Sequence, residues 1–120
     1  MTINTADGGR TWSEMTALDM PNPGCPLAGS RLSTREMLLI FNNAEHERDD
    51  LSFALTSDEG VTYRVIHDLE KPPPDTIFQY GVRYPDLIRT ADGCFHLLCS
   101  FRRTGIKYVR FNEAWLNDKR

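Results

Sequence analysis

The segments TADGGRTW at residues 5–12 and TSDEGVTY at residues 56–63 share the pattern Thr-x-Asp-x-Gly-x-Thr-aromatic, and their aspartates lie 51 residues apart (58 minus 7). In each segment the Asp carboxylate can accept hydrogen bonds from the backbone amides that follow it. The Gly two positions later supplies a positive φ, and the closing aromatic packs back onto a sheet. Each segment therefore predicts a tight turn between two antiparallel strands, and together they indicate a structural repeat.

Short strand-like runs surround the two turns. We expect a pair of strands around Asp7, then four strands, then three more, and no segment predicts a helix. The four are expected near residues 27–32, 36–42, 50–56 and 63–68, and the three at 84–89, 94–101 and 106–111. Two proline-containing segments, residues 21–24 and 72–75, interrupt this pattern. Because proline does not fit in a central strand, we expect long connections there.

A four-stranded meander that recurs about every 50 residues is typical of a β-propeller blade. The fold class that we predict is therefore all-β, built of antiparallel four-stranded blades. Residues 1–20 are the end of one blade, residues 21–70 a complete blade, and residues 71–120 a last, three-stranded blade. About two and a quarter blades are too few to close a ring of four to eight. We expect the open edges to drive self-association or to pair with missing upstream blades.

The composition excludes several partner classes. Fourteen Lys and Arg against 17 Asp and Glu give a net charge of -3, so we expect no nucleic-acid partner and no membrane partner. Arginine nonetheless outnumbers lysine by 11 to 3, which favours an anionic ligand because the guanidinium grips carboxylates through two bonds. The chain as given has no secretory signal and no apolar span, and we expect it to be cytoplasmic as it stands.

We expect no metal and no cofactor. The three histidines show no spacing that indicates a shared metal ion. The three cysteines are too few and too unevenly placed for a disulfide framework, so reduced thiols are the prediction.

The two turns match the Asp-box, or bacterial neuraminidase repeat, and the chain resembles the C-terminal part of sialidase-like proteins of that class. Further matching segments are Pro21-Asn22-Pro23, Leu38 to Asn43 followed by Arg48-Asp49-Asp50-Leu51, Tyr84-Pro85-Asp86-Leu87-Ile88, Asp92-Gly93 and Ile106-Lys107-Tyr108-Val109. The resemblance covers nearly all 120 residues. It implies the last blades of a six-bladed sialidase propeller.

The resemblance also implies a site. In sialidases, three arginines hold the substrate carboxylate, a tyrosine assisted by a glutamate is the nucleophile, and an aspartate is the general acid. Arg48 matches the position of the third arginine. Tyr84 resembles the nucleophile of the Tyr-Ser-x-Leu segment, although Pro85 replaces the Ser. The other two arginines, the glutamate and the aspartate have no match in this chain, and we expect them in upstream blades.

The topology of a meander places these residues together independently of the family resemblance. Successive turns of a meander alternate between its two ends, so Arg48, before the third strand of its blade, and Tyr84, at the start of the next blade, fall on one rim. Arg102 and Arg103 reach the same rim from the last blade, and Arg103 is a further candidate for substrate binding. Both Asp-box turns fall on the opposite rim. We therefore predict that Asp7 and Asp58 are structural.

The chemistry suits an acidic sugar. A sialoside carries a carboxylate next to its anomeric carbon, and a neutral Tyr nucleophile avoids the repulsion that a second carboxylate would meet. A free Tyr is only about one part in a thousand ionised at pH 7, so Tyr84 needs a base.

Two other interpretations stay open. Arg48 lies in an acidic loop and could form a surface ion pair, and Tyr84 could be a strand aromatic packed under Pro85. We predict that Trp12, Tyr63 and Trp115 are packing residues. The function predicted is a sialidase-like glycoside hydrolase, and the alternative is a non-catalytic carbohydrate-binding or interaction fragment of a propeller.

Overall fold

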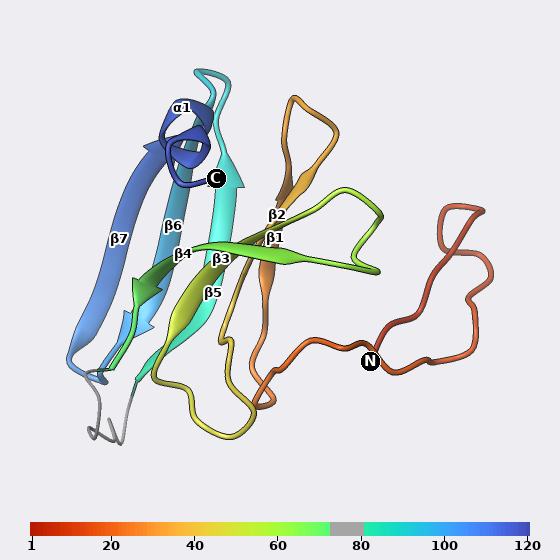
Figure 1. The fold of residues 1–120 in the computed structure, drawn as a ribbon, viewed down its shortest axis with the longest axis horizontal. Helices are drawn as coiled ribbons and strands as arrows, with labels where there is room; N and C mark the ends of the chain where they lie inside the picture. Colours follow the sequence, from red (N-terminus) through yellow and green to blue (C-terminus); the bar gives the residue numbers. More distant parts are fainter. Residues whose placement is uncertain (73–80) are drawn as a thin grey trace.

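The computed structural model describes residues 1–72 and 81–120, and their regular structure is almost entirely antiparallel β-sheet (Figure 1). The first sheet contains β1 (Ala28–Arg31), β2 (Met37–Phe41), β3 (Leu51–Thr56) and β4 (Arg64–Glu70) in that order. The second contains β5 (Val82–Arg89), β6 (Cys94–Phe101) and β7 (Gly105–Asn112) in that order. Each sheet is an up-and-down meander, and the two are blades of a partial β-propeller.

The main hydrophobic core lies between the two sheets. Leu38 and Ile40 of β2 and Phe53 of β3 pack there with Phe95 and Leu97 of β6, and all five side chains are fully buried. The alternate residues of the first sheet form a second cluster on its other face, which consists of Leu39, Phe41 and Ala54 with Met20 and Tyr63 against them. Because both faces of the first sheet are covered, every residue of β3 is buried, including the polar Ser52 and Thr56.

A short helix, α1 (Glu113–Asn117), follows β7, where the sequence predicted none. The Asn112 Oδ1 atom caps it by accepting a hydrogen bond from the Trp115 N–H at 2.9 Å. Five residues are too few to show a helical period in the sequence. The helix holds Leu116 in the core, and the Trp115 ring contacts those of Phe53 and Phe111, so Trp115 is a packing residue as predicted.

The region around the first turn departs from the prediction. The expected pair of strands around Asp7 is reduced to one isolated bridge between Thr2 and Thr16. Trp12, expected in the core, is 57% exposed, and its indole N–H donates to the Gly9 carbonyl instead. Figure 1 shows residues 1–20 as a loop apart from the two sheets, so no sheet lies beside this turn to cover the ring. The structure therefore contains seven strands in its described residues, against the nine expected.

The second turn packs as predicted. Tyr63 is half-buried, and its ring meets that of Phe41 edge-on at 5.6 Å between centroids. The turn joins β3 to β4, so it lies at the end of the sheet opposite to the β2–β3 connection.

The two turns share several hydrogen bonds to their aspartates. Thr11 and Thr62 each donate from the backbone N–H to Oδ1 of the turn aspartate at 2.9 Å. Their hydroxyls donate to its Oδ2, at 2.7 Å in the first turn and 2.6 Å in the second. Gly9 and Gly60 both have a positive φ, of 90° and 91°. These bonds occupy the carboxylates of Asp7 and Asp58 and lower the pKa of both, that of Asp58 to about 2.

The two proline-containing connections lie between structural units. Residues 21–24 join the first turn to the segment that leads into β1. Of the second, residues 73–75 fall outside the described residues.

Candidate functional site

Arg48 lies in the β2–β3 connection and is half-buried. Its guanidinium donates from Nε and Nη2 to the Pro23 carbonyl, at 3.2 and 3.1 Å, and from Nη2 to the Gly24 carbonyl at 3.2 Å. The Nη1 atom has no hydrogen-bond partner among the described residues. Arg48 thus holds the loop that precedes β1.

Gly81 joins the Arg48 loop to the start of β5. A Cβ atom at Gly81 would lie 2.5 Å from the carbonyl carbon of Arg48, which is closer than side chains approach backbone. The Gly81 carbonyl also accepts a hydrogen bond from the Arg102 N–H at 3.1 Å. Three segments far apart in the sequence therefore meet at this glycine: the β2–β3 connection, the start of β5 and the β6–β7 turn. We call the end of the two sheets where they meet the Gly81 rim.

A buried amide supports the same junction. The Asn42 side chain has no exposed surface, and its Nδ2 donates to the carbonyls of Asp50 and Val82. The Asn43 N–H donates to the Asp50 carboxylate at 2.8 Å, and burial raises the pKa of Asp50. These bonds tie the two ends of the Arg48 loop to each other and to β5.

Tyr84 lies on the Gly81 rim in a strained backbone conformation. Its φ is +54°, and it falls at the shift in register between Arg83 and Asp86 of β5. A left-handed conformation costs a residue with a Cβ about 1–2 kcal/mol, and such strain is found more often at functional sites. The bulge leaves the Tyr84 side chain 55% exposed while Pro85 is buried, so Tyr84 does not pack under Pro85.

Arg102 and Arg103 form the turn between β6 and β7. Both have positive φ, of 49° and 54°, and both are exposed. The Arg102 guanidinium lies over the Phe101 ring, 4.9 Å from its centroid. The turn therefore brings two cationic side chains to the Gly81 rim.

Sequence reasoning missed two residues of this region. Cys25 follows the loop that Arg48 holds; burial raises the pKa of its thiol, while the positive charges of Arg48 and Arg83 oppose this rise. Arg83 precedes Tyr84, and its Nε atom is buried with no hydrogen-bond partner among the described residues. The only signal for Arg83 in the sequence is its place beside Tyr84, because the bulge breaks the alternation that would assign it a face.

This rim is rich in arginine. Arg48, Arg83 and Arg103 reach it from three separate segments. Guanidinium groups bind planar carboxylates through paired hydrogen bonds. The described residues contain no group of three His, Cys, Asp or Glu side chains that could hold a metal ion. They also contain no helix long and apolar enough to cross a membrane.

Known proteins resemble this chain. The model of the BNR repeat-like domain family matches residues 1–97. A curated sialidase from Micromonospora viridifaciens is 30% identical over 123 aligned residues, which cover 93% of this chain. The chain spans 18% of the length of that sialidase.

Proposed function

This chain belongs to the sialidase-like BNR repeat family, and we propose that it is the C-terminal portion of a sialidase-like glycoside hydrolase that acts on terminal sialic acid or a related acidic sugar. The observation that carries the proposal is the junction at Gly81, where the segments of Arg48, Tyr84 and Arg103 meet.

In this proposal the arginines bind and Tyr84 reacts. Arg48 and Arg103 donate hydrogen bonds to the substrate carboxylate and so orient the sugar. The Tyr84 hydroxyl oxygen attacks the anomeric carbon while a base takes its proton; the glycosidic C–O bond breaks, and the leaving oxygen takes a proton from a general acid supplied by upstream blades. Water then hydrolyses the bond between Tyr84 and the sugar. The exposed ring and the strained backbone of Tyr84 fit a side chain that is held toward a substrate.

One observation favours the alternative of a non-catalytic sugar-binding or interaction fragment. Arg48 donates three hydrogen bonds to the carbonyls of Pro23 and Gly24, so part of its role is to hold a loop. If Arg48 only holds this loop, Arg103 is the one carboxylate-binding residue that remains among those predicted from the sequence.

Calorimetric titration with sialic acid tests the proposal. We expect Arg48→Ala and Arg103→Ala each to weaken binding about tenfold, because each removes charge-assisted hydrogen bonds. Arg10→Ala is the matched control, since it removes the same charge from the first turn, which lies in the loop of residues 1–20 apart from the two sheets (Figure 1). Unchanged binding in both rim variants would refute the proposed site. Arg103→Ala keeps the test informative if Arg48→Ala loosens its loop.

The catalytic step needs a separate measurement. We expect the isolated chain to show negligible turnover of a sialoside, since the glutamate, the aspartate and two arginines of the sialidase set have no match in it. In a longer form that carries these groups, Tyr84→Phe should abolish turnover and leave binding of sialic acid mostly intact. A Tyr84→Phe variant with full turnover would exclude Tyr84 as the nucleophile.

A further inference from the structure

Arg83 is the second residue of β5, and it carries a guanidinium without a partner among the described residues. Its side chain is half-buried, and its Nε atom is buried with no acceptor for the N–H. None of the ion pairs within the described part of the chain includes Arg83. A guanidinium remains charged in any fold, so a buried N–H of this group without an acceptor costs free energy. Such a group in a folded protein indicates a partner that residues 1–72 and 81–120 do not supply.

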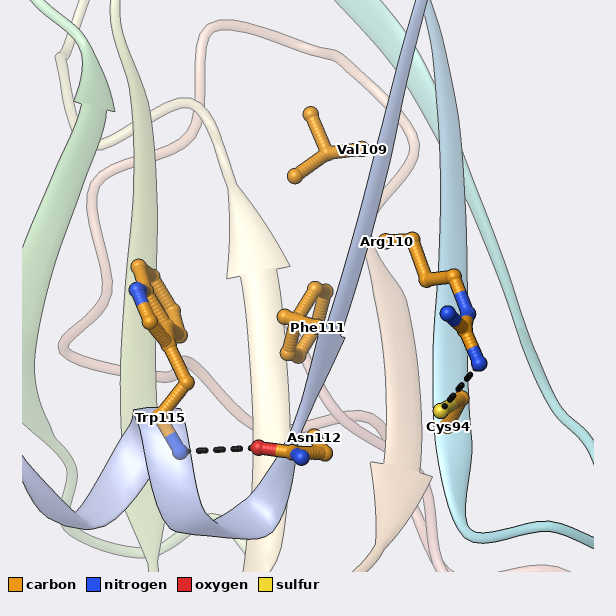
Figure 2. A pocket seen from close by; sticks show the side chains of 6 residues that line it. All are labelled: Cys94, Val109, Arg110, Phe111, Asn112 and Trp115. Atoms are coloured by element: carbon orange, nitrogen blue, oxygen red, sulfur yellow. Dashed lines mark hydrogen bonds between the residues drawn. The ribbon is translucent and has the colours of Figure 1, made fainter.

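Other arginines of the second sheet do have partners. The Arg89 side chain, at the far end of the same strand, is 35% exposed and forms an ion pair with Glu113 at 2.6 Å. Arg110 of β7 donates to the Cys94 sulfur at 3.0 Å, and Figure 2 shows its side chain extending to that sulfur on β6. The fold thus provides acceptors for these two arginines, whereas the buried Nε atom of Arg83 has none among the described residues.

Arg83 lies near Arg48, although the two come from different sheets. Arg48 belongs to the β2–β3 connection of the first sheet, and Arg83 to β5 of the second. The positive charges of both act on the Cys25 thiol, which is only 7% exposed, so both guanidinium groups lie near this sulfur. Two cations beside one buried group create a positive potential that favours an anion.

The bulge in β5 bears on where Arg83 can act. In a regular strand, neighbouring side chains such as those of Arg83 and Tyr84 point to opposite faces of the sheet. The positive φ of Tyr84 and the shift in register between Arg83 and Asp86 break this alternation. The Ser100 hydroxyl donates to the Arg83 carbonyl at 3.1 Å and holds the backbone at this point. The bulge therefore allows Arg83 and Tyr84 to serve the same rim.

We propose that Arg83 is a further anion-binding residue of the Gly81 rim, and that its guanidinium forms its ion pair with the carboxylate of a bound ligand. The planar fork of a guanidinium suits a carboxylate, which accepts two parallel hydrogen bonds from it. That the ligand is an acidic sugar rests on the proposed function, whereas the need for an anion rests on Arg83 itself. The sequence gave no sign of this role, because Arg83 belongs to neither of the repeated turns.

Two matched variants separate binding from stability. Arg83→Met removes the charge and keeps an unbranched apolar stem, and Arg89→Met makes the same change on the same strand. We expect Arg83→Met to weaken binding of sialic acid about tenfold in calorimetric titration. Its midpoint of denaturation should be unchanged or raised, because no bond within the described residues is lost. Arg89→Met should bind as the wild type does and unfold at lower denaturant, because it breaks the pair with Glu113.

Either half of this comparison can overturn the inference. Binding of sialic acid by Arg83→Met within about twofold of the wild type would do so. A loss of stability in Arg83→Met as large as that in Arg89→Met would do so too, because it would show that the Arg83 guanidinium serves the fold.

Acetate separates this inference from the proposed function, because it carries a carboxylate and no sugar. In the wild type, the nuclear magnetic resonance signal of the Arg83 Nε–H should shift on addition of acetate and of sialic acid, and this measurement needs no variant. A shift with acetate in a chain that does not bind sialic acid would refute the proposed function and support the anion site at Arg83. Binding of sialic acid that depends on Arg48 and Arg103 and leaves the Arg83 signal unmoved would support the proposed function and overturn the inference.

Discussion

The backbone of Arg48 lies directly against Gly81, at a position where any side-chain carbon on residue 81 would collide with it. This contact brings the loop that carries Arg48 to the strand that carries Tyr84. The Gly81 carbonyl extends the junction to the β6–β7 turn through its bond to the Arg102 N–H.

Gly81→Ala should therefore disrupt the rim. The added methyl group meets backbone, which cannot move aside as the end of a flexible side chain can, so we expect the free energy of unfolding to fall by about 1–3 kcal/mol. Gly105→Ala is the control, because an added Cβ at Gly105 meets no atom within 4 Å. Denaturant titration of both variants gives the comparison. Equal stability of the two variants would show that the backbone around Gly81 moves to accept the methyl group without loss of free energy of unfolding.

The backbone strain at Tyr84 predicts that replacement by glycine leaves the fold more stable than replacement by alanine, which reverses the usual order. Tyr84→Gly and Tyr84→Ala both remove the exposed ring, but only glycine adopts a φ of +54° without strain. We expect the glycine variant to be more stable than the alanine variant by about 1 kcal/mol, despite its greater flexibility when unfolded. Thermal unfolding of the pair measures this difference. A more stable alanine variant would mean that the bulge relaxes once the ring is gone.

The carboxylate of Asp58 predicts a dependence of stability on pH. Its pKa is about 2 in the folded chain, because the Thr62 hydroxyl and N–H donate to it, and about 3.9 when unfolded. A group whose pKa is lowered by folding stabilises the fold above its unfolded pKa, so this contribution is complete above about pH 4 and is lost as the pH falls to about 2. Asp58→Asn should thus be less stable than the wild type at pH 7, and the gap should close near pH 2. Asp7→Asn should have a smaller effect, since residues 1–20 form no sheet.

Glu113 forms a contact between the two sheets that the sequence did not indicate. Its carboxylate accepts hydrogen bonds from the Ser33 N–H at 3.1 Å and from Arg89 at 2.6 Å, and the Ser33 bonds chiefly lower its pKa. It thereby fastens the β1–β2 turn to the end of the second sheet. Glu113→Ala should reduce the free energy of unfolding by about 1–3 kcal/mol at pH 7. The loss should shrink below pH 4, where the carboxylate is protonated in the unfolded chain and then in the folded one. A pH-independent loss would assign the effect to packing instead.

Local patterns explain what the sequence could predict. The two turns depend on residues within eight positions of each other, and their spacing revealed the repeat and hence the sheets. The shared rim of Arg48 and Tyr84 followed from the alternation of turns in a meander. Contacts between distant segments leave no such pattern: the contact of Gly81 with Arg48, the bonds of Glu113 to Ser33 and the place of Arg83 beside Cys25 required coordinates. Trp12 was misassigned because its turn motif matches that of Tyr63, whereas burial depends on a sheet being alongside.

Chemical-shift mapping of the chain with sialic acid tests the central claim most directly, because it reports where an acidic sugar binds and not only whether it binds. The account predicts that shifts concentrate on the Gly81 rim, at Arg48, Gly81, Tyr84 and Arg103, and that galactose, which lacks the carboxylate, does not produce them. Shifts that cluster at the opposite rim, around Asp58 and Thr62, or that galactose reproduces, would contradict the account.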